Sequence, residues 1–216
     1  MSTKQSLRIT EIFFSLQGET SRVGLPTVFV RLTGCPLRCG YCDSEYAFHG
    51  GESWTIDRIL EEIRQHGTPY VCVTGGEPLA QKGCLTLLTR LCDEGFAVSL
   101  ETSGALPIDH VDPRVSRIVD IKTPGSGEVM KNHWQNLNVL TRADELKFVI
   151  CHEADYQWAR QLIMDYSIHH RCPVLMSPVH GGVEPDELAN WILRDKLPVR
   201  YQLQLHKVLW GNTPGK

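Results

Sequence analysis

The sequence contains no long apolar run and no cluster of like charges. No uninterrupted apolar stretch approaches the ~20 residues that span a bilayer, and residues 1–6 lack the apolar segment of a secretory signal. We therefore expect a cytoplasmic protein with no membrane partner. The formal net charge is −3 without a Lys/Arg run, which argues against a nucleic-acid partner. An anionic substrate would have to be held by individual cations.

Cysteine is too sparse for a disulfide scaffold, with eight residues in a chain of 216. In a reducing compartment such cysteines more often bind metal or fill the core. No linker, low-complexity segment or repeat interrupts the chain, so we expect a single domain over residues 1–216. The cysteines that stand alone among apolar neighbours are interpreted as small core side chains: Cys72, Cys84, Cys92, Cys151 and Cys172.

Strand-like and helix-like patterns alternate through most of the chain, which is typical of parallel βα units. Helical stripes begin near Ile56, Cys84, Ala159 and Leu188, and Thr55 is expected to cap the first of these helices. About six βα repeats are too few for a closed eight-stranded barrel. The pattern therefore predicts an α/β fold with an open, partial βα barrel. Strands are expected at residues 27–32, 70–73, 96–100, 117–121, 145–150, 174–176 and 200–206.

Polar segments follow four of these predicted strands directly. They are a cysteine-containing loop at residues 35–42 and the segments 74–77, 101–103 and 122–126. The carboxyl ends of parallel strands lie at the same edge of a sheet, and binding sites of such folds form there. We therefore expect the four segments to converge on one site.

The cysteine loop carries Cys35, Cys39 and Cys42 in a C-x3-C-x2-C pattern. An iron–sulfur cube normally takes four thiolate ligands, so a loop with three predicts that one iron is left open for another ligand. A structural zinc with His49 as the fourth ligand is an alternative, although no second cysteine pair follows at a zinc-ribbon distance. Ordinary cysteines without a metal are a further alternative.

The spacing Cys35-x3-Cys39-x-Tyr41-Cys42 resembles the signature of the radical S-adenosylmethionine (SAM) enzymes, and the Gly-Gly-Glu-Pro run at residues 75–78 resembles their second mark. By itself, Gly-Gly-Glu is more often only a turn. The resemblance implies that three thiolates hold a [4Fe–4S] cluster whose fourth iron chelates SAM. An electron from the cluster then cleaves SAM to a 5′-deoxyadenosyl radical, so the chemistry belongs to the cluster and the radical rather than to a catalytic side chain.

A narrower resemblance, to the 7-carboxy-7-deazaguanine synthases, covers nearly the whole chain. It is carried by residues 14–20, by Gly24 and residues 29–31, and by residues 42–44, 101–104 and 204–212. It implies conversion of 6-carboxy-5,6,7,8-tetrahydropterin to 7-carboxy-7-deazaguanine with loss of ammonia, an early step toward deazapurine nucleosides such as queuosine. It also implies that SAM is regenerated, that Mg²⁺ assists, that a flavodoxin or ferredoxin-type protein is the reductant, and that the enzyme is a homodimer.

Carried over by position, the resemblance implies a set of pterin-binding residues. Arg31 lies on a strand expected to be buried, where an unpaired charge is costly. A substrate carboxylate would satisfy its planar fork, and a salt bridge to an internal acid is the alternative. His206 is expected on the polar face of the last strand, with the segment beyond it closing the site, and a purely structural histidine is the alternative. The full set is Leu16, Gln17, Gly18, Glu19, Arg31, Thr74 and His206.

The same carry-over implies contacts to the cofactors. Ser44 stands where many relatives carry a Thr ligand of Mg²⁺, and it keeps the hydroxyl oxygen that this ion accepts. Ser103 and Lys122 also fit an ordinary loop, and Glu101 fits a structural cap as well as a ligand contact. The SAM-binding set is Tyr41, Cys42, Asp43, Gly76, Glu77, Ser103 and Lys122.

Two other functions fit part of the pattern. A glycyl-radical-activating enzyme also uses a short radical SAM barrel, but it must dock a large protein, and many such enzymes carry extra cysteine clusters that this sequence lacks. A non-catalytic zinc or iron–sulfur electron-carrier module would need only the cysteine loop. The polar segment at residues 17–19 favours a small pterin substrate and hence the deazaguanine-forming lyase.

Overall fold

A mixed β-sheet runs through the molecule, for which the computed structural model describes residues 5–211, 213 and 215. Within these residues nine strands pair in the order β3-β1-β2-β4-β5-β6-β7-β8-β9. Every neighbouring pair from β2 to β9 is parallel, whereas β1 pairs antiparallel with both β2 and β3. The strands are β1 (Ser6–Leu16), β2 (Pro26–Leu32), β3 (Glu52–Thr55), β4 (Tyr70–Gly75), β5 (Ala97–Thr102), β6 (Ser116–Asp120), β7 (Glu145–Ile150), β8 (Val174–Pro178) and β9 (Arg200–Tyr201).

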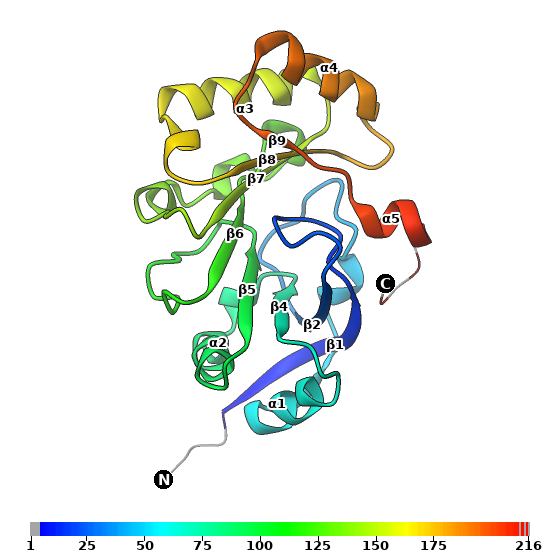
Figure 1. Ribbon diagram of the computed structural model, residues 1–216, viewed down its shortest axis with the longest axis vertical. Coiled ribbons are helices and arrows are strands. Elements are labelled where there is room, and N and C mark those ends of the chain that lie inside the picture. The colour runs from blue at the N-terminus through cyan, green and yellow to red at the C-terminus, as the bar shows by residue number, and fades with distance from the viewer. Residues whose placement is uncertain (1–4, 212, 214, 216) are drawn as a thin grey trace.

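Helices cover the outer face of the curved sheet. In Figure 1, α1 and α2 lie at the lower end of the molecule, while α3 and α4 lie at the upper end beside β7, β8 and β9. The predicted cap of α1 is confirmed, because the Thr55 side chain accepts a hydrogen bond from the Arg58 N–H. The helices are α1 (Ile56–Arg64), α2 (Gly83–Asp93), α3 (Glu153–Asp165), α4 (Pro185–Asp195) and α5 (Leu205–Trp210).

Side chains alternate between the apolar core and the hollow side of the sheet. On β2, Val30 and Leu32 are fully buried in the core, while Arg31 lines a cavity on the opposite face. On β7, Phe148 is fully buried in the core, while Lys147 lines the same cavity. This period of two follows from the pleat of a strand. It places a few polar side chains inside an open α/β barrel, the fold class that the sequence predicts.

The predicted last strand differs from the structure. Strand β9 ends at Tyr201, and Gln202 makes a final ladder bond through its N–H to the Met176 carbonyl, at 2.9 Å. The chain then leaves the edge of the sheet and forms α5, which contains His206. Gln202 is buried and Leu203 is exposed. The alternation of residues 201–204 therefore does not mark the two faces of a strand and instead reflects the contacts of this extended segment. The placement of His206 on a strand is therefore wrong.

The isolated cysteines fall into two groups. Cys72, Cys84 and Cys172 are buried, as expected for small core side chains. Cys92 is only partly buried but packs against the core. Cys151 is also partly exposed and is not among the core residues, because it follows the carboxyl end of β7, where the strand leaves the core. Its interpretation as a core residue is therefore wrong.

Within the part of the chain that the structure describes, none of the helices combines the length and apolar character needed to cross a membrane.

Candidate active site

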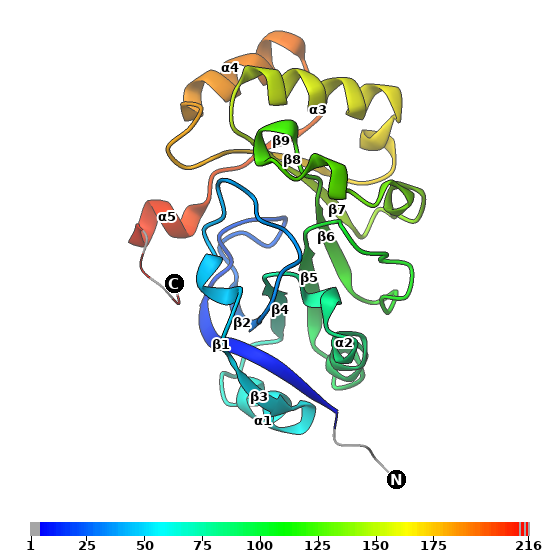
Figure 2. The same cartoon turned by 180° about the vertical axis from the view of Figure 1, so that it is seen from behind.

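A cavity of about 740 Å³ opens at the carboxyl ends of the parallel strands. It collects all four polar segments that the sequence predicts to converge: the cysteine loop and the residues after β4, β5 and β6. The loop after β1 and residues of the C-terminal segment complete the wall. Figures 1 and 2 show how α5, drawn in red, lies beside the β1–β2 end of the sheet. Among the predicted site residues, all but Glu77 line this cavity.

The three thiols of Cys35, Cys39 and Cys42 all face this cavity from one loop. Burial raises the pKa of Cys39 to about 11, although the nearby Lys122 ammonium opposes the shift. Thiolates bind metal, so loading a metal centre here must release protons. The part of the chain that the structure describes holds no three His, Cys, Asp or Glu side chains grouped around a single ion position. The three cysteines offer soft sulfur ligands on one wall of the cavity, and multi-iron clusters are held by such thiolates.

The backbone at Gly76 passes directly against this loop. A Cβ atom there would lie 2.3 Å from the Gly34 carbonyl oxygen and 2.8 Å from the Cys35 Cβ atom. Glycine is therefore required for this close approach. The Glu77 N–H donates to the same Gly34 carbonyl at 2.8 Å, which fixes the segment after β4 to the start of the cysteine loop.

The carboxylate of Glu77 lies behind the cavity wall. It is fully buried and accepts hydrogen bonds from the Thr102 hydroxyl at 2.9 Å and from the Ser103 N–H at 2.7 Å. It also accepts from the Leu79 N–H at 2.9 Å. We expected this side chain to contact SAM. In the structure it does not line the cavity, and its oxygens are hydrogen-bonded to neighbouring loops. Its effect on the cavity is to fix Ser103, which does line the wall.

Lys122, Tyr41 and Asp120 form a buried polar group beside the cysteines. The Lys122 Nζ atom lies 2.8 Å from Asp120 Oδ2 and 5.9 Å from the centre of the Tyr41 ring. Burial disfavours the Lys122 charge, yet the Asp120 carboxylate and the neighbouring thiols raise its pKa. Within the described residues, Tyr41 OH and Asp120 Oδ1 are buried without a hydrogen-bond partner. Such orphaned polar atoms on a cavity wall fit a polar cofactor.

Arg31 forms a salt bridge to an internal acid, one of the two alternatives from the sequence, and still lines the cavity. Its Nε atom donates to Glu11 Oε1 at 2.7 Å, and the Tyr46 hydroxyl donates to the same oxygen at 2.8 Å. The guanidinium carbon lies 5.7 Å from the centres of the Phe13 and Tyr46 rings. Its two terminal nitrogens form no hydrogen bond with the residues that the structure describes, and the side chain lines the cavity. The internal acid thus orients the guanidinium and leaves its planar fork free.

Glu101 joins two of the predicted substrate residues. Its Oε2 atom accepts from the Thr74 hydroxyl at 3.0 Å, and its Oε1 atom accepts from the Gln17 amide at 3.3 Å. The carboxylate therefore orients both side chains from the end of β5 and is not a helix cap. Leu16 lines the same part of the wall.

Glu19 is held by residues from two distant parts of the chain. One carboxylate oxygen forms an ion pair with the Lys147 ammonium on β7. The other accepts a hydrogen bond from the Gln204 amide at 2.7 Å. Sequence reasoning missed Lys147, although a lysine within the otherwise apolar run of residues 146–150 carries the same signal that singled out Arg31.

His206 reaches the cavity from α5 and packs on Gly18. A Cβ atom at Gly18 would lie 2.1 Å from His206 Nδ1, so the side chain requires bare backbone there. The Leu205 N–H also donates to the Gly18 carbonyl at 2.9 Å. Burial lowers the pKa of His206, although the Glu19 carboxylate opposes this shift. Burial therefore favours the neutral form of this imidazole.

Ser44, Asp43 and Lys207 connect the cysteine loop to the C-terminal helix. The Ser44 hydroxyl donates to Asp43 Oδ1 at 3.0 Å, and Lys207 Nζ lies 3.0 Å from Asp43 Oδ2. Burial disfavours the Asp43 charge, but Lys207 outweighs it and lowers the pKa of Asp43 to about 2. Asp43 and Ser44 thus present oxygen atoms on the cavity wall, and oxygen is the ligand type that hard divalent cations prefer.

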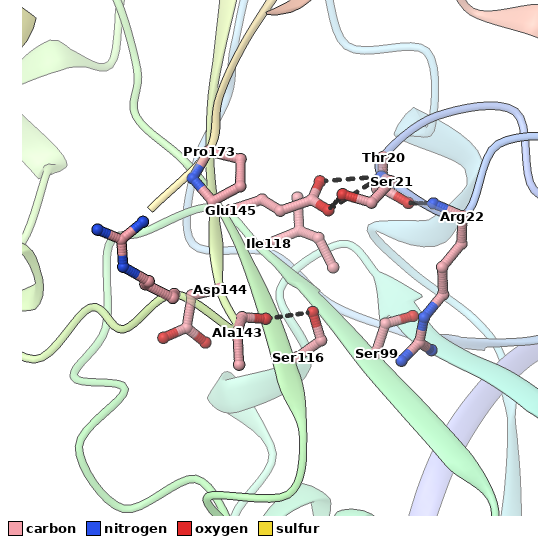
Figure 3. Close-up of a pocket in the computed structure, with 11 residues that line it drawn as sticks. Thr20, Ser21, Arg22, Ser99, Ser116, Ile118, Ala143, Asp144, Glu145 and Pro173 are labelled. Atoms are coloured by element: carbon pink, nitrogen blue, oxygen red, sulfur yellow. Dashed lines mark hydrogen bonds between the residues drawn. The ribbon is translucent and has the colours of Figure 1, made fainter. Parts of the chain in front are cut away.

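A second cavity of about 130 Å³ lies near the opposite ends of the strands. Figure 3 shows the Glu145 carboxylate pointing at Ser21 from the start of β7. Glu145 accepts from the Ser21 N–H at 2.9 Å and from its hydroxyl. None of the predicted site residues lines this cavity. The contact between Glu145 and Ser21 in this cavity instead fixes the loop between β1 and β2 to the start of β7.

Comparison with known proteins gives consistent matches. Residues 29–121 match the model of the Radical SAM superfamily. A 7-carboxy-7-deazaguanine synthase of Chlorobaculum tepidum is 49% identical over 214 residues, which covers 98% of this chain and 97% of the relative. A synthase of the same name from Koribacter versatilis is 43% identical, covering 94% and 97%. The crystal structure of QueE from Escherichia coli aligns with a TM-score of 0.76 over 93% of this chain and 95% of that chain; at 22% identity this likeness shows the fold.

Proposed function

Because this chain belongs to the 7-carboxy-7-deazaguanine synthase family of radical SAM enzymes, we propose that it converts 6-carboxy-5,6,7,8-tetrahydropterin to 7-carboxy-7-deazaguanine. The reaction contracts the pterin ring and releases ammonia, so the protein is a carbon–nitrogen lyase of deazapurine biosynthesis. The observation that carries the proposal is the 49% identity to a curated synthase across nearly both full lengths. The cavity supports it, because three thiols and a free guanidinium fork line one space.

The cysteine loop is the proposed cluster site. Cys35, Cys39 and Cys42 would hold a [4Fe–4S] cluster, which supplies the electron that turns SAM into a hydrogen-abstracting radical. The backbone at Gly76 and the side chain of Ser103 line the cavity beside the thiols and are proposed to contact SAM. Tyr41, Asp43 and Lys122 belong to the same proposed set, supported by the unpartnered Tyr41 hydroxyl and the buried Lys122 charge. Glu77 is proposed to act through Ser103.

The opposite part of the cavity is the proposed pterin site. Arg31 would bind the substrate carboxylate with its free fork, since charge-assisted bidentate pairs are strong and directional. Gln17 and Glu19 would bind the polar edge of the heterocycle, as an amide and a carboxylate can accept from its N–H groups. Leu16, Gly18, Thr74 and His206 complete the proposed set and line the same cavity.

Mg²⁺ is proposed to bind at Ser44. Its hydroxyl and the neighbouring Asp43 carboxylate present oxygen ligands at the cavity wall, while substrate and water would supply the rest. The C-terminal segment is proposed to close the site, supported by its contacts to Gly18, Glu19 and Asp43. A cytoplasmic homodimer that receives electrons from a flavodoxin or ferredoxin-type protein completes the proposal.

Anaerobic reconstitution followed by turnover tests the function. The expected results are about four irons and four sulfides per chain, a SAM-dependent change in the EPR signal of the reduced cluster, and conversion of the carboxytetrahydropterin. Zinc alone, or a cluster that SAM does not perturb, would favour a carrier module. A responsive cluster without pterin conversion would favour another radical SAM activity, such as glycyl-radical activation.

A further inference from the structure

Lys147 is a mostly buried cation on the hollow side of β7. Only 14% of its side-chain surface is exposed, it lines the large cavity, and its ammonium forms an ion pair with Glu19. A buried charge is costly unless it is paired, and here the partner is a proposed substrate residue. None of the roles inferred from the cysteine and Gly-Gly-Glu patterns involves Lys147.

The Glu19 carboxylate is fixed at both oxygens. Lys147 binds Oε2, and the Gln204 amide donates to Oε1 at 2.7 Å. A carboxylate has about four acceptor positions, so each oxygen retains capacity for a further donor. The pair of contacts therefore sets the direction of the carboxylate and leaves it able to bind a ligand.

The loop that carries Glu19 has a second anchor on the same strand. Glu145 stands two residues before Lys147 on β7 and binds Ser21, which stands two residues after Glu19. In Figure 3 this contact lies in the small lower cavity. The loop would therefore remain anchored through Glu145 if Lys147 were replaced. The positive charge beside Glu19 would be lost, because Lys147 supplies it.

We propose that Lys147 is a positioning residue of the synthase, which keeps Glu19 ionised and aimed at the donor groups of the pterin. This inference rests on the proposed function. Without Lys147, the buried carboxylate would take up a proton at a higher pH, and one of its acceptor positions would become a donor facing other donors.

The electrostatics around the pair agree with this role. Burial raises the pKa of Glu19, but Lys147, with smaller contributions from Gln204 and His206, outweighs burial, so the net pKa lies below its usual value. The other titratable groups that face the pair are His206 from α5, Asp120 from β6, Glu101 from β5 and Asp43 from the cysteine loop. Burial disfavours the Lys147 charge, yet Glu19, Asp120 and Glu101 raise its pKa.

The test compares Lys147→Met with Lys147→Arg in the reconstituted enzyme. For Lys147→Met we expect the acidic limb of kcat/KM for the pterin to move up by about one pH unit or more, since loss of a close opposite charge shifts a carboxyl by 1–3 units. Below the shifted limb, KM should rise about tenfold for each pH unit, and it should recover as the pH increases. Lys147→Arg should restore most of the wild-type profile, and SAM cleavage without the pterin should persist in both variants.

Two controls isolate the route through Glu19. Lys147→Met should add little to KM in a Glu19→Gln background, because residues that act through one another are not additive. Glu145→Gln keeps the loop contact at Ser21 and should leave the acidic limb in place. A limb that arises from His206 would survive Glu19→Gln, whereas one that arises from Glu19 would disappear.

The outcomes separate this inference from the proposed function. A wild-type enzyme that fails to convert the pterin overturns the function itself. An active wild type with an unmoved acidic limb in Lys147→Met, or an undiminished Lys147→Met effect in the Glu19→Gln background, overturns the role of Lys147. Iron content and pterin-independent SAM cleavage report on folding, and Lys147→Gln replaces the Met variant if these are lost.

Discussion

Arg31 illustrates how one guanidinium forms a structural contact on one side and keeps free donors on the other. Glu11 and Tyr46 hold its Nε side, and the terminal nitrogens remain available in the cavity. The ion pair is partly exposed, at 16% and 23% of the side-chain surface, so its own contribution to stability is small. Its main effect is to orient the guanidinium.

Replacement of Arg31 by Ala should weaken pterin binding while SAM cleavage without the pterin continues. Loss of hydrogen bonds between charged groups costs about 1.5–3 kcal/mol, which corresponds to about a 10- to 150-fold rise in KM. Arg31→Lys should recover only part of this, because it keeps the charge and loses the fork. Equilibrium binding of the pterin to the SAM-loaded enzyme is the measurement. Arg64→Ala is the matched control, because it removes an exposed arginine that does not line the cavity. Equal pterin affinity in the Arg31→Ala and Arg64→Ala variants would show that Arg31 does not bind the substrate.

Ser44→Ala should reduce the stimulation of turnover by Mg²⁺, because the proposed hydroxyl ligand is lost. Ser44→Thr keeps that oxygen and should respond to Mg²⁺ like the wild type. Titration of turnover with Mg²⁺ should give a half-saturating concentration several-fold higher in the Ala variant, since one weak ligand is worth about 1 kcal/mol. If the Ala variant and the wild type share one titration curve, the ion is held elsewhere.

At the residue scale, sequence reasoning found the charges that stand beside a motif and missed those that do not. Arg31 was recognised because it precedes the cysteine loop on a predicted strand. Lys147 sits in an equally apolar strand, but no neighbouring motif points to it. Glu11 was missed because β1 itself was not anticipated, so its alignment opposite Arg31 in the β1–β2 register was unknown.

The C-terminal segment from β9 to α5 is the element with the clearest division between stability and function. Helix α5 contains no fully buried residue. Its neighbourhood nevertheless contacts the loop after β1 through Leu205 and Gln204 and the cysteine loop through Lys207. Such an element adds little to the core and much to the wall of the site.

A chain that ends at Leu203 should therefore fold and load iron but bind the pterin poorly. We expect Tm to fall by no more than about 4 °C, since 1 kcal/mol shifts Tm by roughly 2–4 °C in a chain of this size. KM should rise strongly, because Gln204, His206 and Lys207 are removed together. Thermal unfolding and anaerobic kinetics are the measurements. A large loss of Tm would show that the segment is part of the core.

Elements with a strong apolar period were predictable, and those at the ends of the sheet were not. Helix α1 and strand β7 agree with the expected positions because burial enforces their periods. Strand β9 is an edge strand of two residues, and the alternation beyond it comes from contacts with the loop after β1. Local pattern alone does not distinguish a ladder partner from a loop partner.

At the scale of the whole molecule, stability depends on buried contacts between elements, such as the ion pair between Arg117 on β6 and Asp144 just before β7. Arg117 Nη2 lies 2.6 Å from Asp144 Oδ2, and Asp144 also accepts from the Thr141 N–H at 2.8 Å. Only 10% and 1% of the Arg117 and Asp144 side-chain surfaces are exposed. Both side chains are remote from the large cavity, which neither lines.

Asp144→Ala should thus destabilise the molecule without changing substrate recognition. Leaving a buried arginine unpaired costs about 3–5 kcal/mol, which should appear as a lower urea midpoint with an unchanged slope. The fraction that remains folded should keep the wild-type KM for the pterin. A changed KM at temperatures well below the transition would instead indicate coupling between this pair and the site.

The open barrel and its single polar end were predictable as a whole, because parallel strands place their carboxyl ends together. The clasp that completes the wall was not predictable. It joins residues 18–21 to residues 200–205 through four hydrogen bonds. The pairs are Gly18 with Leu205, Glu19 with Gln204, Thr20 with Gln202, and Ser21 with Arg200. These partners are separated by nearly the full chain, and no local pattern reports such a distance.

That clasp has a consequence for synthesis on the ribosome. The cysteine loop at residues 35–42 is synthesised well before residues 200–205, which clasp the loop after β1. A nascent chain that still lacks residues 200–205 would therefore have its cysteine loop in place but an incomplete cavity wall, because the loop after β1 would lack its partners.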